Sequence, residues 1–255
     1  FKDKGKEIIV ANAGVDGQST RGHIKNFNLW FNSIPDLKPK YFLFFIGVND
    51  FNITYGSNND SIEDINKFYN LKSKIKNNSI SFFLYQYFKN VFSKYFTDIA
   101  HPVGHSSQNF SNIIWEKDSL SQNYENHFRN QLSEFEKRLE ILCQKVQDYD
   151  AIPIFVTQSN RRLYKFVNGK VYGDSSFRKQ HSGLTINAID YYHIIRLFNN
   201  VTKKVSRMKK AVFIDLDTEL EFNLENDFYD SCHHTPAGAK KIGEYLFEKL
   251  SFIFM

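Results

Sequence analysis

The sequence has few of the residues that mark disulfide-rich, metal-binding or membrane-spanning proteins. Its 255 residues include two cysteines, Cys143 and Cys232. Two cysteines so far apart predict neither a disulfide framework nor a metal site, and they leave the redox compartment open. Four of the histidines, at positions 23, 101, 105 and 181, show no metal-ligand spacing. No stretch of 18 or more residues is apolar enough to span a bilayer. We therefore expect no metal site among these residues.

Signals for nucleic-acid binding are also missing. The 33 lysines and arginines exceed the 28 acidic residues by five, but the basic residues are scattered along the chain. Pairs such as Lys203-Lys204 and Lys209-Lys210 are typical of a solvated surface, and no zinc-finger or RNA-binding pattern accompanies them. With 42% hydrophobic and 24% charged residues, the chain has the composition of an ordinary globular protein, and its length fits one domain or one domain with a cap.

The chain begins with Phe1 rather than methionine. We therefore expect the sequence to be part of a longer polypeptide. Any signal peptide or membrane anchor would belong to the upstream part, so the cell compartment is left open.

Short apolar runs alternate with segments of helical spacing, which predicts an α/β fold with a mostly parallel sheet. Each run is rich in Ile, Val or Phe and flanked by turn residues, as in strands buried on both faces. The expected strands are 7–12, 41–46, 152–157 and 211–215. The expected helices cover 24–34, 128–146, 186–205 and 242–250, and Thr235-Pro236 opens the last one as its N-cap and first residue.

More than a hundred residues separate the second and third predicted strands, so we expect an insertion over roughly 57–126. Residues 80–95 in this insertion place apolar side chains on one broad helical face. Three interpretations stay open for that face: packing on the domain, contact with a membrane surface, or an acyl-chain pocket. We expect a loop over 98–118.

Chemistry in an open parallel sheet takes place at the carboxyl ends of the strands. The motif GVND follows the second strand, and its Asn49 can present an amide donor to a negative oxygen. In NAGVDG after the first strand, Gly17 can offer a backbone N–H because no side chain blocks the approach. Gln158 and Arg161, after the third strand, are candidates for substrate binding.

A histidine pattern follows the last strand. In Asp230-Ser-Cys-His233-His-Thr235, a carboxylate three residues before a histidine can fold back onto the imidazole. It then fixes the tautomer and leaves the other ring nitrogen as a general base. Such a pair can activate a hydroxyl nucleophile. Each motif alone also fits an ordinary turn or helix cap.

Taken together and in this order, the motifs resemble the SGNH/GDSL hydrolase family. NAGVDG resembles its glycine block, GVND its asparagine block, and DSCHHTPAG its DxxH block. The resemblance implies a three-layer, flavodoxin-like fold and a serine esterase mechanism without cofactors. It implies that Gly17 and Asn49 form the oxyanion hole, that His233 is the base and that Asp230 is its partner. Asp50 and Thr235 would support the site.

One block of the family pattern is missing. The family's nucleophilic serine lies in a GDS motif on the first strand, upstream of the glycine block, and no serine precedes NAGVDG here. Ser19 follows that block and is expected to cap a helix. We therefore expect residues 1–255 to be a single SGNH hydrolase domain that lacks its first strand, with the nucleophile outside this chain. In this form it should be inactive.

The expected function is hydrolysis of an acetyl or other small acyl ester on a carbohydrate or lipid. Two alternatives stay open: an acyltransferase that uses the same residues, and a non-catalytic carbohydrate-binding or scaffolding module. The expected partner is a small-molecule or glycan ester, not a nucleic acid, with membrane-surface contact through 80–95 as an open interpretation. The oligomeric state is not predicted.

Overall fold

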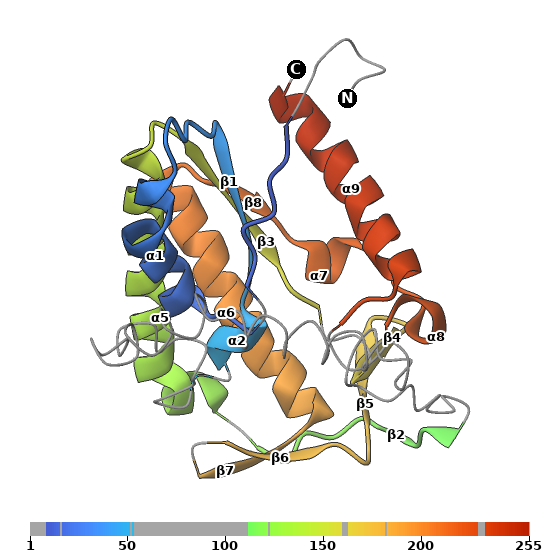
Figure 1. The fold of residues 1–255 in the computed structure, drawn as a ribbon. Helices are drawn as coiled ribbons and strands as arrows, with labels where there is room; N and C mark the ends of the chain where they lie inside the picture. Colours follow the sequence, from blue (N-terminus) through green and yellow to red (C-terminus); the bar gives the residue numbers. More distant parts are fainter. Residues whose placement is uncertain are drawn as a thin grey trace, which may run out of the picture.

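The structure is a computed structural model that describes residues 9–15, 17–51, 53, 112–121, 123–159, 163–181, 183–228 and 233–254 (Figure 1). Its helices are α1 (Thr20–Leu29), the 3-10 helix η2 (Phe31–Ser33), α2 (Val48–Phe51), α5 (Tyr124–Gln147), α6 (Ala188–Lys209), α7 (Leu216–Glu219), α8 (Leu224–Asp227) and α9 (Pro236–Phe254). Its strands are β1 (Tyr41–Ile46), β2 (Trp115–Glu116), β3 (Ile152–Thr157), β4 (Tyr164–Val167), β5 (Lys170–Asp174), β6 (Arg178–His181), β7 (Leu184–Asn187) and β8 (Val212–Ile214).

A parallel sheet in the order β1-β3-β8 forms the centre of the fold. Its register pairs Ile46 with Thr157 and Val156 with Ile214, so the carboxyl ends of all three strands lie at one edge. These strands match three of the four predicted apolar runs. The prediction of an α/β fold with a parallel sheet is therefore confirmed.

Helices cover both faces of this sheet, because its side chains alternate between two apolar clusters. On one face Phe44 and Ile46 pack with α1, α5 and α6. On the other face Ile154 and Val156 pack against α9. Figure 1 shows the same three layers, with α1, α5 and α6 on one side of the strands and α9 on the other.

The first predicted strand, 7–12, is wrong for its described residues. Residues 9–12 form no strand, and the side chains of Ile9 and Val10 are 91% and 87% exposed. Among the described residues no strand pairs with the outer edge of β1, and Leu43 in the middle of β1 is 44% exposed. An apolar run forms a strand only when its backbone pairs with that of a neighbouring strand, and residues 9–12 pair with none of the described strands.

Two hairpins between β3 and α6 were not predicted. β4 and β5 pair antiparallel around Asn168 and Gly169, which both have positive φ, and β6 pairs with β7. Asn-Gly is the strongest short hairpin signal, because both central residues of this turn need φ above zero.

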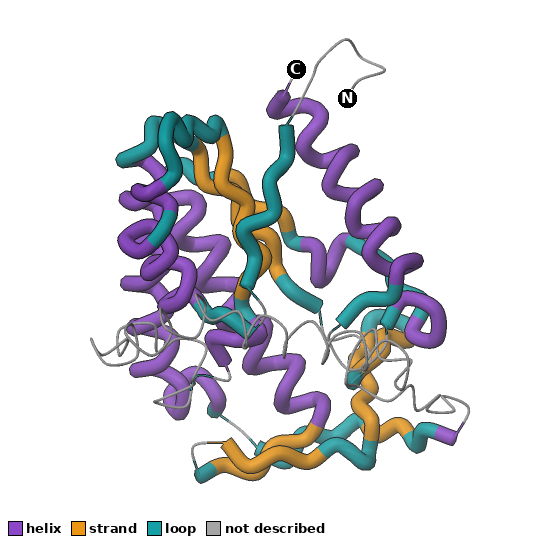
Figure 2. Tube along the Cα trace, in the orientation of Figure 1, coloured by secondary structure: helices purple, strands orange, loops and turns teal. Residues whose placement is uncertain are grey.

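The prediction that Ile186 lies in a helix is also wrong, since Ile186 belongs to β7 and α6 begins at Ala188. Figure 2 shows these strands near the carboxyl end of the central sheet.

The insertion can be compared with the structure only at its C-terminal end. Residues 54–111, with the predicted helical face over 80–95, lie outside the described residues. The loop predicted over 98–118 is wrong at Trp115 and Glu116, which form β2 and pair with β5. Helix α5 begins at Tyr124, two residues before the predicted end of the insertion.

Candidate active site

The turn at Gly17 leads directly into helix α1. Gly17 has φ of +71°, a left-handed conformation that costs glycine little. Ser19 caps the helix, since its hydroxyl accepts a hydrogen bond from the N–H of Arg21 over 3.2 Å. The expectation that Ser19 is a helix cap is confirmed, and the turn carries the Gly17 N–H at the start of α1.

Asn49 lies beside this turn. It belongs to α2, the short helix that follows β1 after Gly47, and its Nδ2 donates to the main-chain oxygen of Gln18 over 3.0 Å. The structure thus brings the glycine and asparagine motifs together at the carboxyl end of β1. The amide of Asn49 carries a second hydrogen, and for it and for the Gly17 N–H the described residues supply no acceptor. Two N–H groups of this kind can serve a ligand oxygen.

Asp50 is buried behind Asn49. Its carboxylate accepts from the N–H of Thr20 at 3.2 Å and from the Thr20 hydroxyl at 2.5 Å. The guanidinium of Arg138, on α5, lies 3.3 Å from Asp50 Oδ1. Burial raises the pKa of Asp50 from 3.8 to about 6, against the lowering effects of Arg138 and of the hydrogen bonds from Thr20. These contacts connect α2 with α1 and α5, and the supporting role of Asp50 in a catalytic site stays a prediction.

Gln158, directly after β3, contacts the start of α2. Its Oε1 accepts the N–H of Val48 over 2.9 Å, which satisfies the first backbone donor of α2. This contact places Gln158 next to the Asn49 loop, where a part in substrate binding stays a prediction. Arg161, the other residue predicted to bind substrate, lies outside the described residues.

His234, in the described end of the DxxH block, lies near the carboxyl end of β1 as well. The ring of His234 is 6.3 Å from that of Phe45, the penultimate residue of β1, and 4.6 Å from that of Phe228. His233 is exposed to solvent, whereas Asp230 lies outside the described residues. Thr235 accepts from the N–H of Gly238 over 3.1 Å, so the predicted N-cap of α9 is confirmed.

A group of polar side chains after β8 was missed by the sequence reasoning. The Thr157 hydroxyl donates to Asp215 over 3.2 Å, and Tyr164 donates to Asp217 over 2.9 Å. Arg196 Nη1 lies 3.3 Å from Asp215 and 3.6 Å from Asp217. The sequence feature that could have identified this group is the presence of two aspartates, Asp215 and Asp217, directly after a strand. These contacts hold the ends of β3 and β8 to α6.

A buried histidine packs against the far side of α2. The ring of His181 lies 4.5 Å from that of Phe51 and 5.5 Å from that of Phe128. Its Nε2 finds no hydrogen-bond partner in the described part of the chain. Burial lowers the pKa of His181, and the charges of Lys179 and His127 lower it further. We therefore expect a neutral imidazole at neutral pH.

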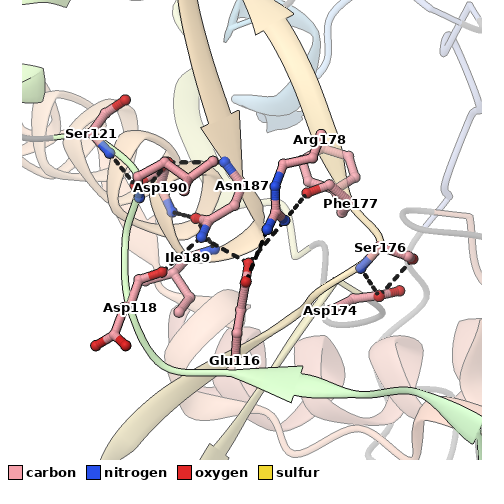
Figure 3. A network of polar contacts seen from close by, with 11 residues as sticks. Glu116, Asp118, Ser121, Asp174, Ser176, Phe177, Arg178, Asn187, Ile189 and Asp190 are labelled. Atoms are coloured by element: carbon pink, nitrogen blue, oxygen red, sulfur yellow. Dashed lines mark hydrogen bonds and ion pairs between the residues drawn. The ribbon is translucent and has the colours of Figure 1, made fainter.

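The C-terminal end of the insertion is fastened to α6 by a polar network (Figure 3). Asn187 caps α6 and also donates to Glu116 over 2.8 Å and to the Asp118 carbonyl over 2.7 Å. Arg178 binds both oxygens of Glu116, at 2.9 and 3.0 Å. Asp190 completes the capping box by accepting from the N–H of Asn187 over 2.9 Å. The network fixes where the chain leaves the insertion.

Within the described ranges, no group of three or more His, Cys, Asp or Glu residues is arranged to hold a metal ion. None of the helices there is long and apolar enough to cross a membrane. Comparison with known proteins finds no match: no protein-family model, no curated protein and no solved structure is similar to the chain. A functional assignment therefore depends on the residues themselves.

Proposed function

We propose that this protein is a serine ester hydrolase of the SGNH/GDSL type that removes an acetyl or other small acyl group from a carbohydrate or lipid. The observation that carries the proposal is the contact between the Gly17 turn and the Asn49 side chain at the carboxyl end of β1. N–H donors that are held in place before a substrate arrives are suited to stabilising an oxyanion.

The proposed reaction passes through an acyl-enzyme. A serine outside this sequence attacks the ester carbonyl carbon while His233 accepts its proton, and Asp230 orients and stabilises the imidazolium. The carbonyl oxygen becomes negative and accepts hydrogen bonds from Gly17 and Asn49. The alcohol leaves with the proton from His233. Water, deprotonated by the same imidazole, then releases the carboxylic acid and restores the serine.

The proposed fold is the three-layer, flavodoxin-like arrangement of that family. Support comes from the parallel order β1-β3-β8 with helices on both faces. In this proposal the strand that carries the serine pairs with the outer edge of β1. A strand there would supply hydrogen-bond partners for β1 and would lie beside the exposed Leu43.

The position of the histidine block also supports the proposal. The side chain of His234 fills an aromatic pocket formed by Phe45, Phe222 and Phe228. His233, next to it, is exposed to solvent. A general base needs this kind of access to its nucleophile and to water.

The test is ester hydrolysis by the protein expressed from its complete reading frame, measured with p-nitrophenyl acetate. His233→Ala should lower kcat/KM by roughly 10²–10⁴-fold, the usual contribution of a general base. Asn49→Ala should lower it by roughly 10²–10³-fold, as for other oxyanion donors. The matched control is His234→Phe, which keeps an aromatic ring in the pocket and should leave turnover close to the wild-type rate.

Equal turnover by wild type and His233→Ala would reject the mechanism. Absence of hydrolysis by the wild type, together with binding of glycan esters, would favour a non-catalytic binding module. Addition of an acceptor sugar separates hydrolysis from transfer, because a transferase forms a new sugar ester whereas a hydrolase forms free acid alone.

A further inference from the structure

Helix α5 carries a buried arginine on the face that meets α1 and α2. Arg138 is 8% exposed, and its neighbour Leu139 is fully buried. Arginine is rarely buried unless its guanidinium is paired. Here Arg138 Nε donates to the Thr20 hydroxyl over 2.7 Å, while Nη2 lies 3.3 Å from Asp50. One guanidinium therefore contacts both α1 and α2.

Thr20 connects Arg138 with Asp50. Its hydroxyl accepts from Arg138 and donates to Asp50, and its backbone N–H also donates to Asp50. Arg138, Thr20 and Asp50 thus form a ring of contacts with one residue from each of α5, α1 and α2; we call it the Asp50 cluster. Every member is buried, so water does not compete for these hydrogen bonds.

A second residue of α5 supports the same helix. Gln131 lies seven residues, or two helical turns, before Arg138, which places both on one face of α5. Its Nε2 donates to the carbonyls of Asp50 and Phe51, over 3.1 and 3.0 Å. These carbonyls belong to the end of α2, where intrahelical partners are missing. Helix α5 therefore holds α2 at two points.

The Asp50 cluster is close in sequence to the two candidate donors, Gly17 and Asn49. Thr20 is three residues after Gly17, and Asp50 follows Asn49. We propose that Arg138 is a positioning residue that sets the separation of the Gly17 N–H and the Asn49 amide through Thr20 and Asp50. Arg138 does not touch the substrate in this proposal. That Arg138 sets the distance between these two donors does not depend on the proposed function. That this distance matters for catalysis rests on the proposed function.

The experiment compares Arg138→Met with Leu139→Ala in the full-length protein. Arg138→Met removes the charge and both donated hydrogen bonds but keeps a long side chain. Leu139→Ala destabilises the same turn of α5 and leaves the Asp50 cluster intact. The readouts are the NMR signals of the Asn49 side-chain amide and the Gly17 backbone amide, recorded as a function of pH, together with kcat and KM.

We expect Arg138→Met to shift both signals and Leu139→Ala to leave both in place. Arg138 is the charged group that acts on Asp50 among the described residues, since Thr20 and Gln131 are neutral. Without the guanidinium the pKa of Asp50 rises above about 6, so the midpoint at which the Asn49 signal titrates should move to higher pH. Arg138→Lys should restore part of both effects.

The expected effect of Arg138→Met on catalysis is a lower kcat. A misplaced donor affects the transition state more than ground-state binding, so kcat should fall by roughly 10–100-fold in Arg138→Met with KM nearly unchanged. If Arg138→Met does not fold, Thr20→Val removes the bridging hydroxyl at nearly constant volume and should shift the same two signals.

Unchanged Gly17 and Asn49 signals in Arg138→Met, or equal shifts in Leu139→Ala, would overturn the positioning role. These outcomes are separate from failure of the proposed function. A protein that hydrolyses no ester but shows the two signal shifts would retain Arg138 as the residue that sets the loop separation, and would lose the esterase mechanism.

Discussion

The side-chain nitrogen of Asn49 lies 3.0 Å from the main-chain oxygen of Gln18. The contact joins α2, the short helix that follows β1, to the turn before α1, across 31 positions of sequence. A hydrogen bond to a backbone carbonyl fixes the plane of the Asn49 amide, so the second hydrogen on the same nitrogen has a defined direction. Directional donors of this kind are what an oxyanion site requires.

Asp50→Asn should change how stability depends on pH. The pKa of Asp50 is about 6 in the folded protein and near 3.8 when unfolded, so the folded state binds this proton more tightly. Its contribution is fully present below about pH 3.8 and is lost as the pH rises through 6. The loss amounts to roughly 3 kcal/mol by linkage.

Urea unfolding of the wild type and Asp50→Asn at pH 4 and pH 7.5 measures this contribution. Subtracting the two proteins at each pH removes the titration of the other carboxylates. The wild-type advantage should be larger at pH 4. An advantage that grows toward pH 7.5 would show that the Arg138 ion pair outweighs the burial of Asp50.

His181→Phe should keep the packing between Phe51 and Phe128 while removing a buried ring nitrogen that has no partner among the described residues. We expect the free energy of unfolding at pH 7.5 to rise by about 1 kcal/mol, because the desolvated nitrogen is removed.

The pH dependence of this variant follows from the pKa of His181, which is lowered in the folded state. A lowered histidine pKa gives stability that is present above 6.5 and is lost as the pH falls below it. The wild type should therefore lose more stability than His181→Phe between pH 7.5 and pH 5. Equal losses in the two proteins would mean that another group is responsible.

Asn187→Ala should be one of the more costly single changes outside the core. Asn187 caps α6 by accepting from the N–H groups of Ile189 and Asp190, and it also donates to Glu116 and to the Asp118 carbonyl. Loss of the cap alone costs about 1–2 kcal/mol. Asn187→Ser keeps a capping oxygen but loses the donors, so it should cost less. Thermal unfolding of both variants tests this order, and equal destabilisation would assign the whole effect to the contacts with residues 116–118.

Gly238→Ala should loosen the junction between α8 and α9. A Cβ at position 238 would overlap the main-chain carbonyl of Asp227, which cannot move as a flexible side chain can. We expect a loss of about 1–3 kcal/mol from this overpacking. Gly243→Ala is the matched control, because it lies on the same helix with no atom within 4 Å of the added Cβ. It should raise stability by up to about 1 kcal/mol. Similar effects of the two variants in urea unfolding would contradict the close contact.

Strands that are long apolar runs were predicted accurately, whereas strands that depend on a partner or on a turn were not. Runs 41–46 and 152–157 were predicted with their observed bounds, because both are continuous apolar runs, as expected for strands covered by helices on both faces. Residues 9–11 are apolar as well and form no strand, since composition does not reveal whether a run pairs with a partner strand. The hairpin at Asn168-Gly169 had a clear turn signal, but its strands are half exposed and lack a continuous apolar run.

By itself, the sequence determined that Asn49 and Gln158 follow two central strands and come to one edge of the sheet. The contact between Asn49 and Gln18, which belongs to the tertiary structure, brings the Gly17 turn to the same edge. Tertiary structure alone decided what surrounds them: that Arg138, more than eighty residues after Asp50, is its buried partner, and that His234 is packed while His233 is exposed. The physical reason is that local apolar patterning indicates where the strands lie along the chain. Partners of buried charges depend instead on which helix faces meet, and such meetings join residues far apart in the chain.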